Sequence, residues 1–415
     1  MDSASSKEKN KSLRVVLLPD EYLPHGTRVH AKMMHELAVQ LTSLGHSVTV
    51  VTPGLHDQKE RLMISWIDGV EVWYFRTPPM RGVGLFRRAV TESLLSFRAW
   101  LATREKLRTR NIDICINYSP TIFFGAFAYF LRSKGAYVYL ILRDFFPQWL
   151  VDQRKLSKVS PIYWYFRAVE LFNYVAAHRI ALQSPKNKMV FIEKNHAFRD
   201  KTSILYNWVA RAPQAALDFK DIDVFLKRGR QKVIFFYGGN MGFAQDMGNL
   251  IGLARRLRHR DDAHFLFIGD GDQVELVTEA AQTLDNISYF PSVPQGVFAS
   301  ILRRIDIGLF TLAREHTAHN FPGKLLGYMQ NEVPILGSIN PGNDLQSVIE
   351  GAQAGIVTVN GDDDSLCDAA MKMLNDPALR RSMGKKALHL RDALFSVEGV
   401  AETILQAYRR EGSGN

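Results

Sequence analysis

A strand–helix–strand pattern at the start of the chain constrains its fold more than any other feature. Residues 13–18 and 48–52 are short apolar runs typical of buried strands, and Gly45 closes the amphipathic segment between them. The apolar face of that segment consists of Met33, Leu37, Leu41 and Leu44. A helix that joins two neighbouring strands of one sheet leaves them parallel, with a right-handed crossover. We therefore expect the chain to begin with a parallel sheet.

The same alternation continues through two series of elements, so that two domains are expected in a chain of 415 residues. Beyond a hairpin at Asp68-Gly69, buried strands are predicted at 112–116, 138–142, 179–182, 232–237, 265–268, 287–290 and 305–310. The predicted organisation is a disordered tail (1–12), a first Rossmann-like domain (13–206), a linker (207–230), a second Rossmann-like domain (231–395) and a C-terminal helical segment (396–415). The fold class is α/β, and the cleft between the two domains is the expected place for chemistry.

Charge and cysteine content limit the partners and the cellular compartment that can be expected for this chain. Residues 1–200 hold 29 Lys and Arg against 17 Asp and Glu, so the positive excess lies in the first half. Zinc-finger spacing, an RNP signature and basic heptads are absent from the sequence, which argues against a nucleic-acid partner. Cys115 and Cys367 have no metal or redox spacing and are expected to stay reduced in a cytosolic protein. The longest uncharged apolar run, near 122–131, is about half of what a bilayer-spanning helix needs.

The segment 83–108 leaves two interpretations open. Its apolar residues are typical of a helix packed on a core, with basic residues on a solvated face. The same pattern is typical of a helix that lies on an anionic membrane surface.

Two glycine-containing stretches of the second half favour anion binding. Residues 238–242, GGNMG, follow a predicted strand and allow the backbone to approach a ligand closely. Residues 319–345 contain a Pro-Gly loop, Lys324 in the first turn of a short helix, and a second turn at 340–344. Helix N-termini and a lysine together attract phosphate, although ordinary turn chemistry would explain the same letters. The spacing is not GxGxxG, so no nicotinamide cofactor is predicted.

Charged residues at two other turns also have competing explanations. Arg143 and Asp144 follow a predicted buried strand, at the sheet edge where open α/β folds bind ligands, and Asp144 could orient a hydroxyl or act as a base. A local ion pair is the alternative. The acidic run at 362–364 resembles a metal cluster, but its place before a helix predicts N-capping, and no metal site is expected.

These features together resemble the retaining GT-B glycosyltransferases of family 4, over nearly the whole chain. The resemblance is carried by residues 143–147, 206–208, 237–242, 269–271, 324–330 and 340–344. It is strongest to the bacterial lipopolysaccharide and O-antigen branch that transfers N-acetyl-fucosamine-type sugars. It implies a GT-B fold whose C-terminal helix crosses back to the first domain. The positions of two glutamates that the family usually carries fall here on His319 and Gly327, and its usual Arg and Lys fall near Asn240 and Gln245.

The resemblance also implies a reaction and a site. A sugar would move from a nucleotide diphosphate, with uridine as the expected base, to an acceptor hydroxyl, with retention of configuration and without a metal or other cofactor. The donor-binding residues would be Gly239, Asn240, Gly242, Gly269, Val293, Pro322, Gly323, Lys324, Leu325, Asn343 and Asp344. The acceptor-binding residues would be His25, Gly26, Thr27, Arg28 and Asn117, and the catalytic candidates are Arg143, Asp144 and His319.

The expected partners follow from this reaction. The donor would be a nucleotide diphosphate sugar, and the acceptor a lipid-linked or lipopolysaccharide saccharide. The basic first half would then dock on the anionic cytoplasmic face of the inner membrane, which makes the protein cytoplasmic and peripheral. A nucleotide-sugar epimerase with the same fold, and a binding protein that has lost catalysis, are the alternatives.

Overall fold

The computed structural model describes residues 12–26, 28–55, 57–80, 83–152, 156–210, 232–315 and 321–412. The chain divides into two compact units, one formed by residues 1–206 with 397–415 and the other by residues 207–396. Nearly all of the predicted tail (1–12) and most of the predicted linker (207–230) lie outside the described residues.

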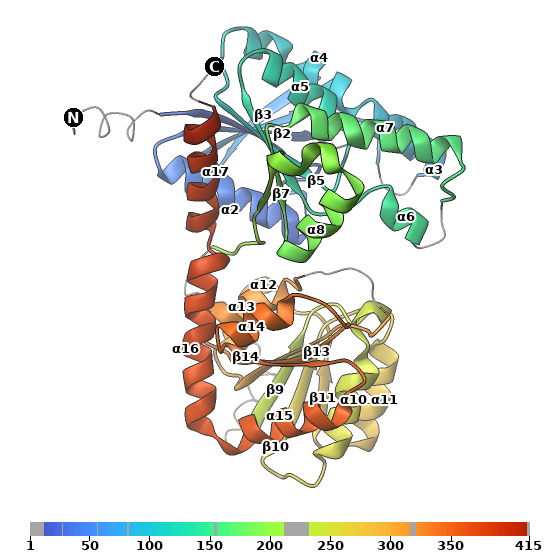
Figure 1. The fold of residues 1–415 in the computed structure, drawn as a ribbon, viewed down its shortest axis with the longest axis vertical. Coiled ribbons are helices and arrows are strands. Elements are labelled where there is room, and N and C mark those ends of the chain that lie inside the picture. The colour runs from blue at the N-terminus through green and yellow to red at the C-terminus, as the bar shows by residue number, and fades with distance from the viewer. Residues whose placement is uncertain are drawn as a thin grey trace, which may run out of the picture. The chain divides into compact units, whose positions relative to one another are not determined.

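The first unit is built on an eight-stranded sheet with the order β3-β4-β2-β1-β5-β6-β7-β8 (Figure 1). Its strands are β1 (Arg14–Leu18), β2 (Ser47–Pro53), β3 (Leu62–Ile67), β4 (Val70–Phe75), β5 (Ile114–Ser119), β6 (Tyr137–Leu142), β7 (Arg179–Leu182) and β8 (Thr202–Ile204). All neighbouring pairs are parallel except β3 and β4, which form the predicted hairpin with Ile64 opposite Trp73. Asp68 and Gly69 make its turn with φ angles of 48° and 79°.

Helices flank this sheet. They are α2 (Val29–Ser43), α3 (Leu85–Ser93), α4 (Leu95–Arg108), α5 (Gly125–Ser133), α6 (Gln148–Asp152), α7 (Pro161–Ala176) and α8 (Pro185–Lys194), with a 3-10 turn, η1 (His196–Lys201). The single helix predicted over 83–108 is wrong, because two helices meet at Leu94, whose ψ is 3°. Just after this break, the Ser96 hydroxyl of α4 donates to the Phe123 carbonyl at 2.6 Å and accepts from the Phe127 amide of α5 at 3.0 Å.

The C-terminal helix α17 (Val397–Glu411) belongs to the first unit, as the resemblance implied. It packs against α2 through its buried face, which consists of Val397, Val400, Ala401, Ile404 and Leu405. At its end, Glu411 accepts a hydrogen bond from the Tyr137 hydroxyl at 2.7 Å and pairs with Arg179. The chain therefore leaves the first unit after β8 and returns to it only at its last helix.

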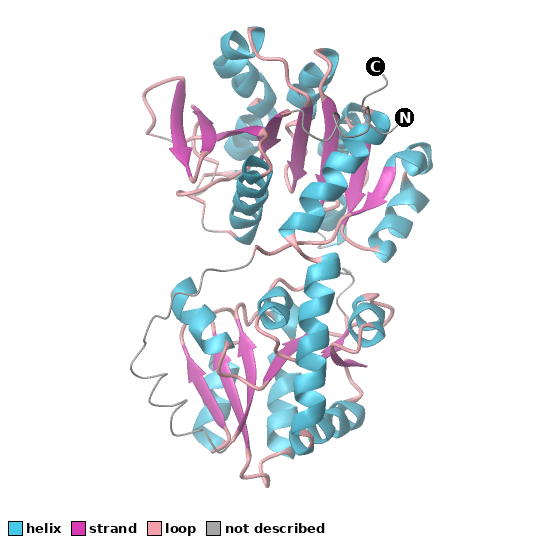
Figure 2. Ribbon diagram, turned by 90° about the vertical axis from the view of Figure 1, so that its left-hand side faces the viewer, coloured by secondary structure: helices cyan, strands magenta, loops and turns pink. Residues whose placement is uncertain are grey.

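The second unit is a six-stranded, wholly parallel sheet with the order β11-β10-β9-β12-β13-β14. Its strands are β9 (Val233–Gly238), β10 (Ala263–Ile268), β11 (Ile287–Phe290), β12 (Ile307–Thr311), β13 (Ile335–Ile339) and β14 (Gly355–Val359). Its helices are α10 (Met247–Arg256), α11 (Val274–Thr283), α12 (Gln295–Leu302), α13 (Lys324–Gln330), α14 (Leu345–Gly351), α15 (Asp363–Asn375) and α16 (Pro377–Leu394), with a 3-10 turn, η2 (Phe243–Gln245). Figure 2 shows helices flanking the strands of each unit.

Each sheet has one point where the strand order reverses. The reversal falls between β1 and β5 in the first unit and between β9 and β12 in the second. Open α/β sheets bind ligands at such points, beyond the carboxyl ends of the strands. Among the helices that the structure describes, none combines the length and apolar character that crossing a bilayer requires.

We expect the contact between α17 and α2 to support the stability of the first unit. Replacing Ile404, which is fully buried, with alanine removes apolar packing and should lower the free energy of unfolding by about 2–4 kcal/mol. Urea denaturation measures this change. Gln406→Ala on the exposed side of the same helix is the control, and an equal loss in both variants would contradict the assigned packing.

Candidate functional site

The glycine loop after β9 lies at the reversal point of the second unit and is tied to the loop after β10. The Gly239 amide donates to the Ile268 carbonyl at 2.9 Å, and the Met241 amide to the Asp270 carbonyl at 2.8 Å. Gly239 has a φ of 105°, which disfavours other residues. A Cβ on Gly269 would lie 1.9 Å from the Gly239 carbonyl oxygen, so Gly269 allows the two loops to touch.

Lys324 is the first residue of α13 and lies under this loop. Its Nζ atom is inaccessible to water, and it has no hydrogen-bond partner among the described residues. That atom lies 3.3 Å from the centroid of the Tyr237 ring. Burial lowers the pKa of Lys324 well below its usual value. The structure thus brings Lys324 and Gly239 together, with a cation that lacks a counter-ion in the described part of the unit.

Tyr328, which sequence reasoning did not select, fixes α13 at the reversal point. Its ring is fully buried, and its hydroxyl lies 3.0 Å from the Leu309 carbonyl of β12 and 3.2 Å from the Phe236 carbonyl of β9. The Gly238 amide donates to the same hydroxyl at 3.3 Å. Tyr328 is thus a positioning residue, because its bonds to β9 and β12 fix the position of α13, and with it Lys324, relative to both strands.

Other predicted donor residues have structural partners. The Asn240 side-chain amide donates to the side-chain Oε1 of Gln245 at 2.8 Å, and the Gly242 backbone amide donates to the same oxygen at 3.1 Å. A neutral amide pair therefore occupies the positions near which the family usually carries Arg and Lys. Pro322 and Gly323 immediately precede α13, and their carbonyls accept from the Leu325 and Leu326 amides.

Leu325 itself is fully buried in the core, so its side chain does not face a ligand. Asn343 is also buried, and its side-chain Oδ1 accepts from the Leu345 amide at 3.0 Å. Asp344 precedes α14 as its N-terminal cap residue, and Val293 is half-buried in the loop between β11 and α12. His319 lies outside the described residues.

A buried polar network at the ends of β12, β13 and β14 was also missed. The side-chain Oδ1 of Asn249 accepts from the Ser338 hydroxyl at 2.5 Å and from the Thr311 hydroxyl at 3.4 Å. Asn360 donates to the Asp246 carboxylate at 2.9 Å. Because Asp246 and Asn249 begin α10, this network fixes the start of that helix beside the glycine loop. Polar residues at the ends of three apolar strands were the available signal.

In the first unit, Asp144 lies in a cluster that sequence reasoning recognised only in part. Asp20 follows β1, and its carboxylate lies 3.2 Å from Nε2 of His30 on α2. The His30 ring stacks on Tyr118 with centroids 5.7 Å apart. The side chain of Asp144 reaches solvent, yet the surrounding protein limits its hydration and raises the pKa of the carboxyl, while His30 lowers that pKa and Asp20 raises it further.

Arg143 lies beside Tyr118 and Asp144 of this cluster and also holds the backbone beyond β8. Its guanidinium donates to the Leu205 carbonyl at 2.6 Å and to the Tyr206 carbonyl at 3.1 Å. Burial lowers the pKa of Arg143, and the neighbouring Tyr118 raises it. These contacts define a positioning residue that fixes the chain where it leaves the first unit.

The predicted acceptor residues differ in exposure and in their contacts. His25 is exposed and meets Tyr74 edge-on, and the Arg28 amide donates to Glu21 at 3.3 Å. Gly26 is buried in the turn after Tyr22, and Thr27 lies outside the described residues. Asn117 is a correction: only 1% of it is exposed, and its amide donates to Asn173 at 2.7 Å, so it joins β5 to α7 and does not reach a ligand.

The capping prediction at 362–364 is confirmed, because the Asp362 carboxylate accepts from the Ser365 amide at 3.1 Å at the start of α15. In the part of the chain that the structure describes, no group of three or more His, Cys, Asp or Glu side chains could hold a metal ion.

Comparison with known families gives this geometry its context. Residues 30–208 match the "Glycosyl transferase 4-like domain" and residues 218–389 match "Glycosyl transferases group 1". A probable glycosyltransferase, WbjE, from Pseudomonas aeruginosa is 25% identical over 61% of this chain and 64% of its own length. A phosphatidyl-myo-inositol mannosyltransferase from Mycobacterium leprae is 26% identical over 36% of this chain and 38% of its own length. The matches thus span less than two thirds of either relative.

Solved structures support the fold. A sucrose-phosphate synthase from Thermosynechococcus elongatus superposes with a TM-score of 0.68 at 14% identity, covering 97% of this chain and 100% of that one. WaaG, a glycosyltransferase involved in lipopolysaccharide biosynthesis, gives a TM-score of 0.60 at 15% identity with the same coverage. The chain therefore has the two-domain GT-B fold with parallel sheets, and each half carries a glycosyltransferase-type domain.

The isolated charge of Lys324 predicts a pH-dependent anion affinity. A diphosphate beside Lys324 would raise the pKa of the lysine again, so binding of the diphosphate should be accompanied by uptake of a proton. The affinity for the diphosphate should therefore fall as the pH rises through the lowered pKa that Lys324 has in the ligand-free protein. Calorimetry with a nucleoside diphosphate in buffers of different ionisation enthalpy measures that proton. Lys324→Met should abolish the uptake and weaken binding by about tenfold or more.

The same variant has a second signature. Removing an unpaired buried cation should leave the ligand-free protein equally stable or more stable. Lys372→Met on the exposed face of α15 is the matched control and should change neither property. A Lys324→Met protein that binds nucleotide normally would contradict the role assigned to this lysine.

Proposed function

We propose that this chain is a glycosyltransferase that moves a sugar from a nucleotide diphosphate to a saccharide acceptor. The observation that carries the proposal is the uncompensated Lys324 ammonium beneath the glycine loop, at the reversal point of a sheet whose unit matches a glycosyltransferase family. A buried cation without a counter-ion fits an anionic ligand group, and the diphosphate of the donor supplies one.

In this proposal the second unit holds the donor. As the bond between sugar and diphosphate breaks, negative charge develops on the leaving oxygen, and Lys324 with the loop amides around Gly239 stabilises it electrostatically. The base, proposed to be uracil, lies near Gly269 and Val293, and Asp344 lies near the sugar or the phosphate. Retention of the anomeric configuration is part of the proposal, with no metal required.

The first unit holds the acceptor. The Asp20–His30 pair and Asp144 present two carboxylates and an imidazole at the carboxyl edge of the sheet, where they can accept hydrogen bonds from sugar hydroxyls. Asp144 is the proposed contact to the attacking hydroxyl, while His25 and Arg28 are exposed at the neighbouring turn.

The role of WaaG in lipopolysaccharide biosynthesis supports an acceptor from lipopolysaccharide or O-antigen assembly. A deoxy or N-acetylamino sugar is the transferred group in this proposal. The proposal includes a lipid-linked acceptor, which would give the protein a peripheral position at the cytoplasmic face of the inner membrane.

A face of the first unit fits such a membrane. Phe97 of α4 is 57% exposed and Trp164 of α7 is 62% exposed. Helix α7 contacts α3, which directly precedes α4, because the Tyr165 hydroxyl of α7 donates to the Ser93 hydroxyl of α3 at 2.6 Å. We call the exposed side chains Val90, Leu94, Phe97, Tyr129, Ile162, Trp164, Tyr165 and Phe172 the aromatic face. Helices α3, α4 and α5 also carry arginines, and this combination of aromatic and basic residues is typical of helices that lie on anionic lipid surfaces.

The decisive measurement is release of nucleoside diphosphate from a panel of nucleotide sugars with and without saccharide acceptor. Release that requires the acceptor supports transfer. Interconversion of the sugar without release would indicate an epimerase, and nucleotide binding without turnover would indicate a protein that has lost catalysis.

Asp144→Asn tests the acceptor side. It keeps the shape but removes the charge, so kcat/KM for the acceptor should fall by about 10²-fold or more, while nucleotide binding stays unchanged. Loss of both properties would indicate damage to the fold. His196→Asn, an exposed polar change elsewhere in the first unit, should leave both unchanged.

Flotation with anionic vesicles tests the aromatic face. Phe97→Ser combined with Trp164→Ser should reduce the floated fraction several-fold, because each side chain removes an apolar anchor. Trp66→Ser is a stringent control, since Trp66 on β3 is 68% exposed but lies outside this face. Equal binding of all three proteins would contradict the proposed orientation.

A further inference from the structure

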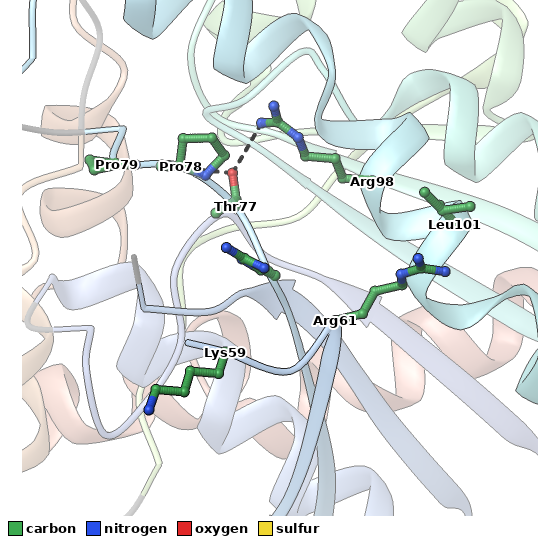
Figure 3. A pocket seen from close by; sticks show the side chains of 8 residues that line it. Lys59, Arg61, Thr77, Pro78, Pro79, Arg98 and Leu101 are labelled. Atoms are coloured by element: carbon green, nitrogen blue, oxygen red, sulfur yellow. Dashed lines mark hydrogen bonds between the residues drawn. The ribbon is translucent and has the colours of Figure 1, made fainter. Parts of the chain in front are cut away.

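A cavity of about 660 Å³ in the first unit has four cations among the eight described residues that line it (Figure 3). Its lining includes Lys59, Arg61, Arg76, Thr77, Arg98 and Leu101, together with two prolines. The cations come from three places in the sequence: the segment before β3, the residue after β4, and α4. A cavity of this size holds a small ligand.

The charge of the cavity is uncompensated. None of its lining residues is acidic, and in the described ranges no ion pair joins any of the four cations to a carboxylate. Arg98 makes only long bonds, to the Thr77 hydroxyl at 3.4 Å and to the Thr91 carbonyl at 3.5 Å. The backbones of Arg61 and Arg76 are held next to each other, since the Arg76 amide donates to the Arg61 carbonyl at 3.0 Å. Four cations that line one cavity repel one another, and an anion between them reduces that repulsion.

The position of the cavity relates it to the acceptor side of the site. Because β4 runs parallel to β2 and β1, Arg76 at its carboxyl end lies on the same sheet edge as Asp20 and Asp144. Two strand spacings, about 10 Å, separate β4 from β1, the strand that Asp20 follows. That separation between Arg76 and the Asp20–His30 pair suits a ligand with a sugar at one end and a phosphate at the other.

We propose that this cavity binds a phosphate or diphosphate ester of the acceptor, so that the acceptor is a phosphorylated or diphosphate-linked saccharide. This inference rests on the glycosyltransferase function proposed above and names the acceptor class. Arginine guanidinium groups bind phosphate oxygens in pairs, and Lys59 adds a point charge at the same rim. The anion held here is separate from the donor diphosphate, which belongs to the second unit.

Calorimetry with inorganic pyrophosphate on the full chain tests the cavity directly. Arg61→Gln combined with Arg76→Gln changes two exposed side chains and should weaken pyrophosphate binding by about tenfold or more. The matched control, Arg108→Gln with Lys134→Gln, removes the same charge from exposed positions outside the cavity and should bind as the wild type does. Equal binding by both double variants and wild type, or equal losses in both, would overturn the proposal. Arg98→Lys, which keeps the charge but not the paired donors, should give an intermediate loss.

Nucleoside diphosphate binding is measured in parallel and should be unchanged in the cavity variant. If the wild-type chain binds no nucleotide, the proposed glycosyl transfer fails, while the pyrophosphate comparison still decides on the cavity. If nucleotide binds but the cavity variant keeps its pyrophosphate affinity, the cavity proposal alone fails.

Two arms identify the source of the ester. The first uses a soluble sugar 1-phosphate, and the second uses phosphatidylcholine vesicles with and without a polyprenyl diphosphate. Binding in either arm that the Arg61→Gln/Arg76→Gln variant loses supports the proposal and names the source as free or lipid-linked. Loss that is equally large with phosphatidylglycerol vesicles, and no competition by pyrophosphate, would show general membrane attraction and overturn it.

Discussion

The hydrogen-bonding geometry of parallel strands determines where a ligand can lie in either unit. Because neighbouring strands run in one direction, the loops that follow them gather at one edge of each sheet. In the second unit this edge carries the glycine loop, Lys324 and the buried polar network. In the first it carries Asp20, Asp144 and the cationic cavity. Residues that are far apart in the sequence thus meet because of strand direction.

Within that frame, the second unit maintains an unfavourable charge at a fixed place. Lys324 could reach water if α13 were free to move, but Tyr328 bonds to the backbones of both strands at the reversal point. The Tyr237 ring partly compensates the ammonium, whose nitrogen is inaccessible to solvent and has no carboxylate partner among the described residues. An arrangement that is poor for the free protein is well suited to a ligand that brings negative charge.

The sequence predicted the parts of the structure that follow from periodicity. Apolar runs located the strands, and the Asp68-Gly69 hairpin and the Asp362 cap were correct because their chemistry is local. Side-chain direction was not predictable. Asn117 sits on β5 near the expected site but points into the interior toward Asn173. Arg143 stays near Asp144, yet its guanidinium bonds to the backbone beyond β8. The break at Leu94 and the Asp20–His30 pair depend on tertiary contacts between distant segments, which no spacing rule records.

The return of α17 to the first unit has a consequence for how this protein is made. Synthesis proceeds from the N-terminus, so residues 207–396 leave the ribosome as a complete unit while the earlier one still lacks its last helix. Until residues 397–411 emerge, the face of α2 that they cover stays open to water and to other chains. The unit that is synthesised first is therefore completed last. A fragment that stops at residue 206 would expose the apolar face of α2 that α17 otherwise covers.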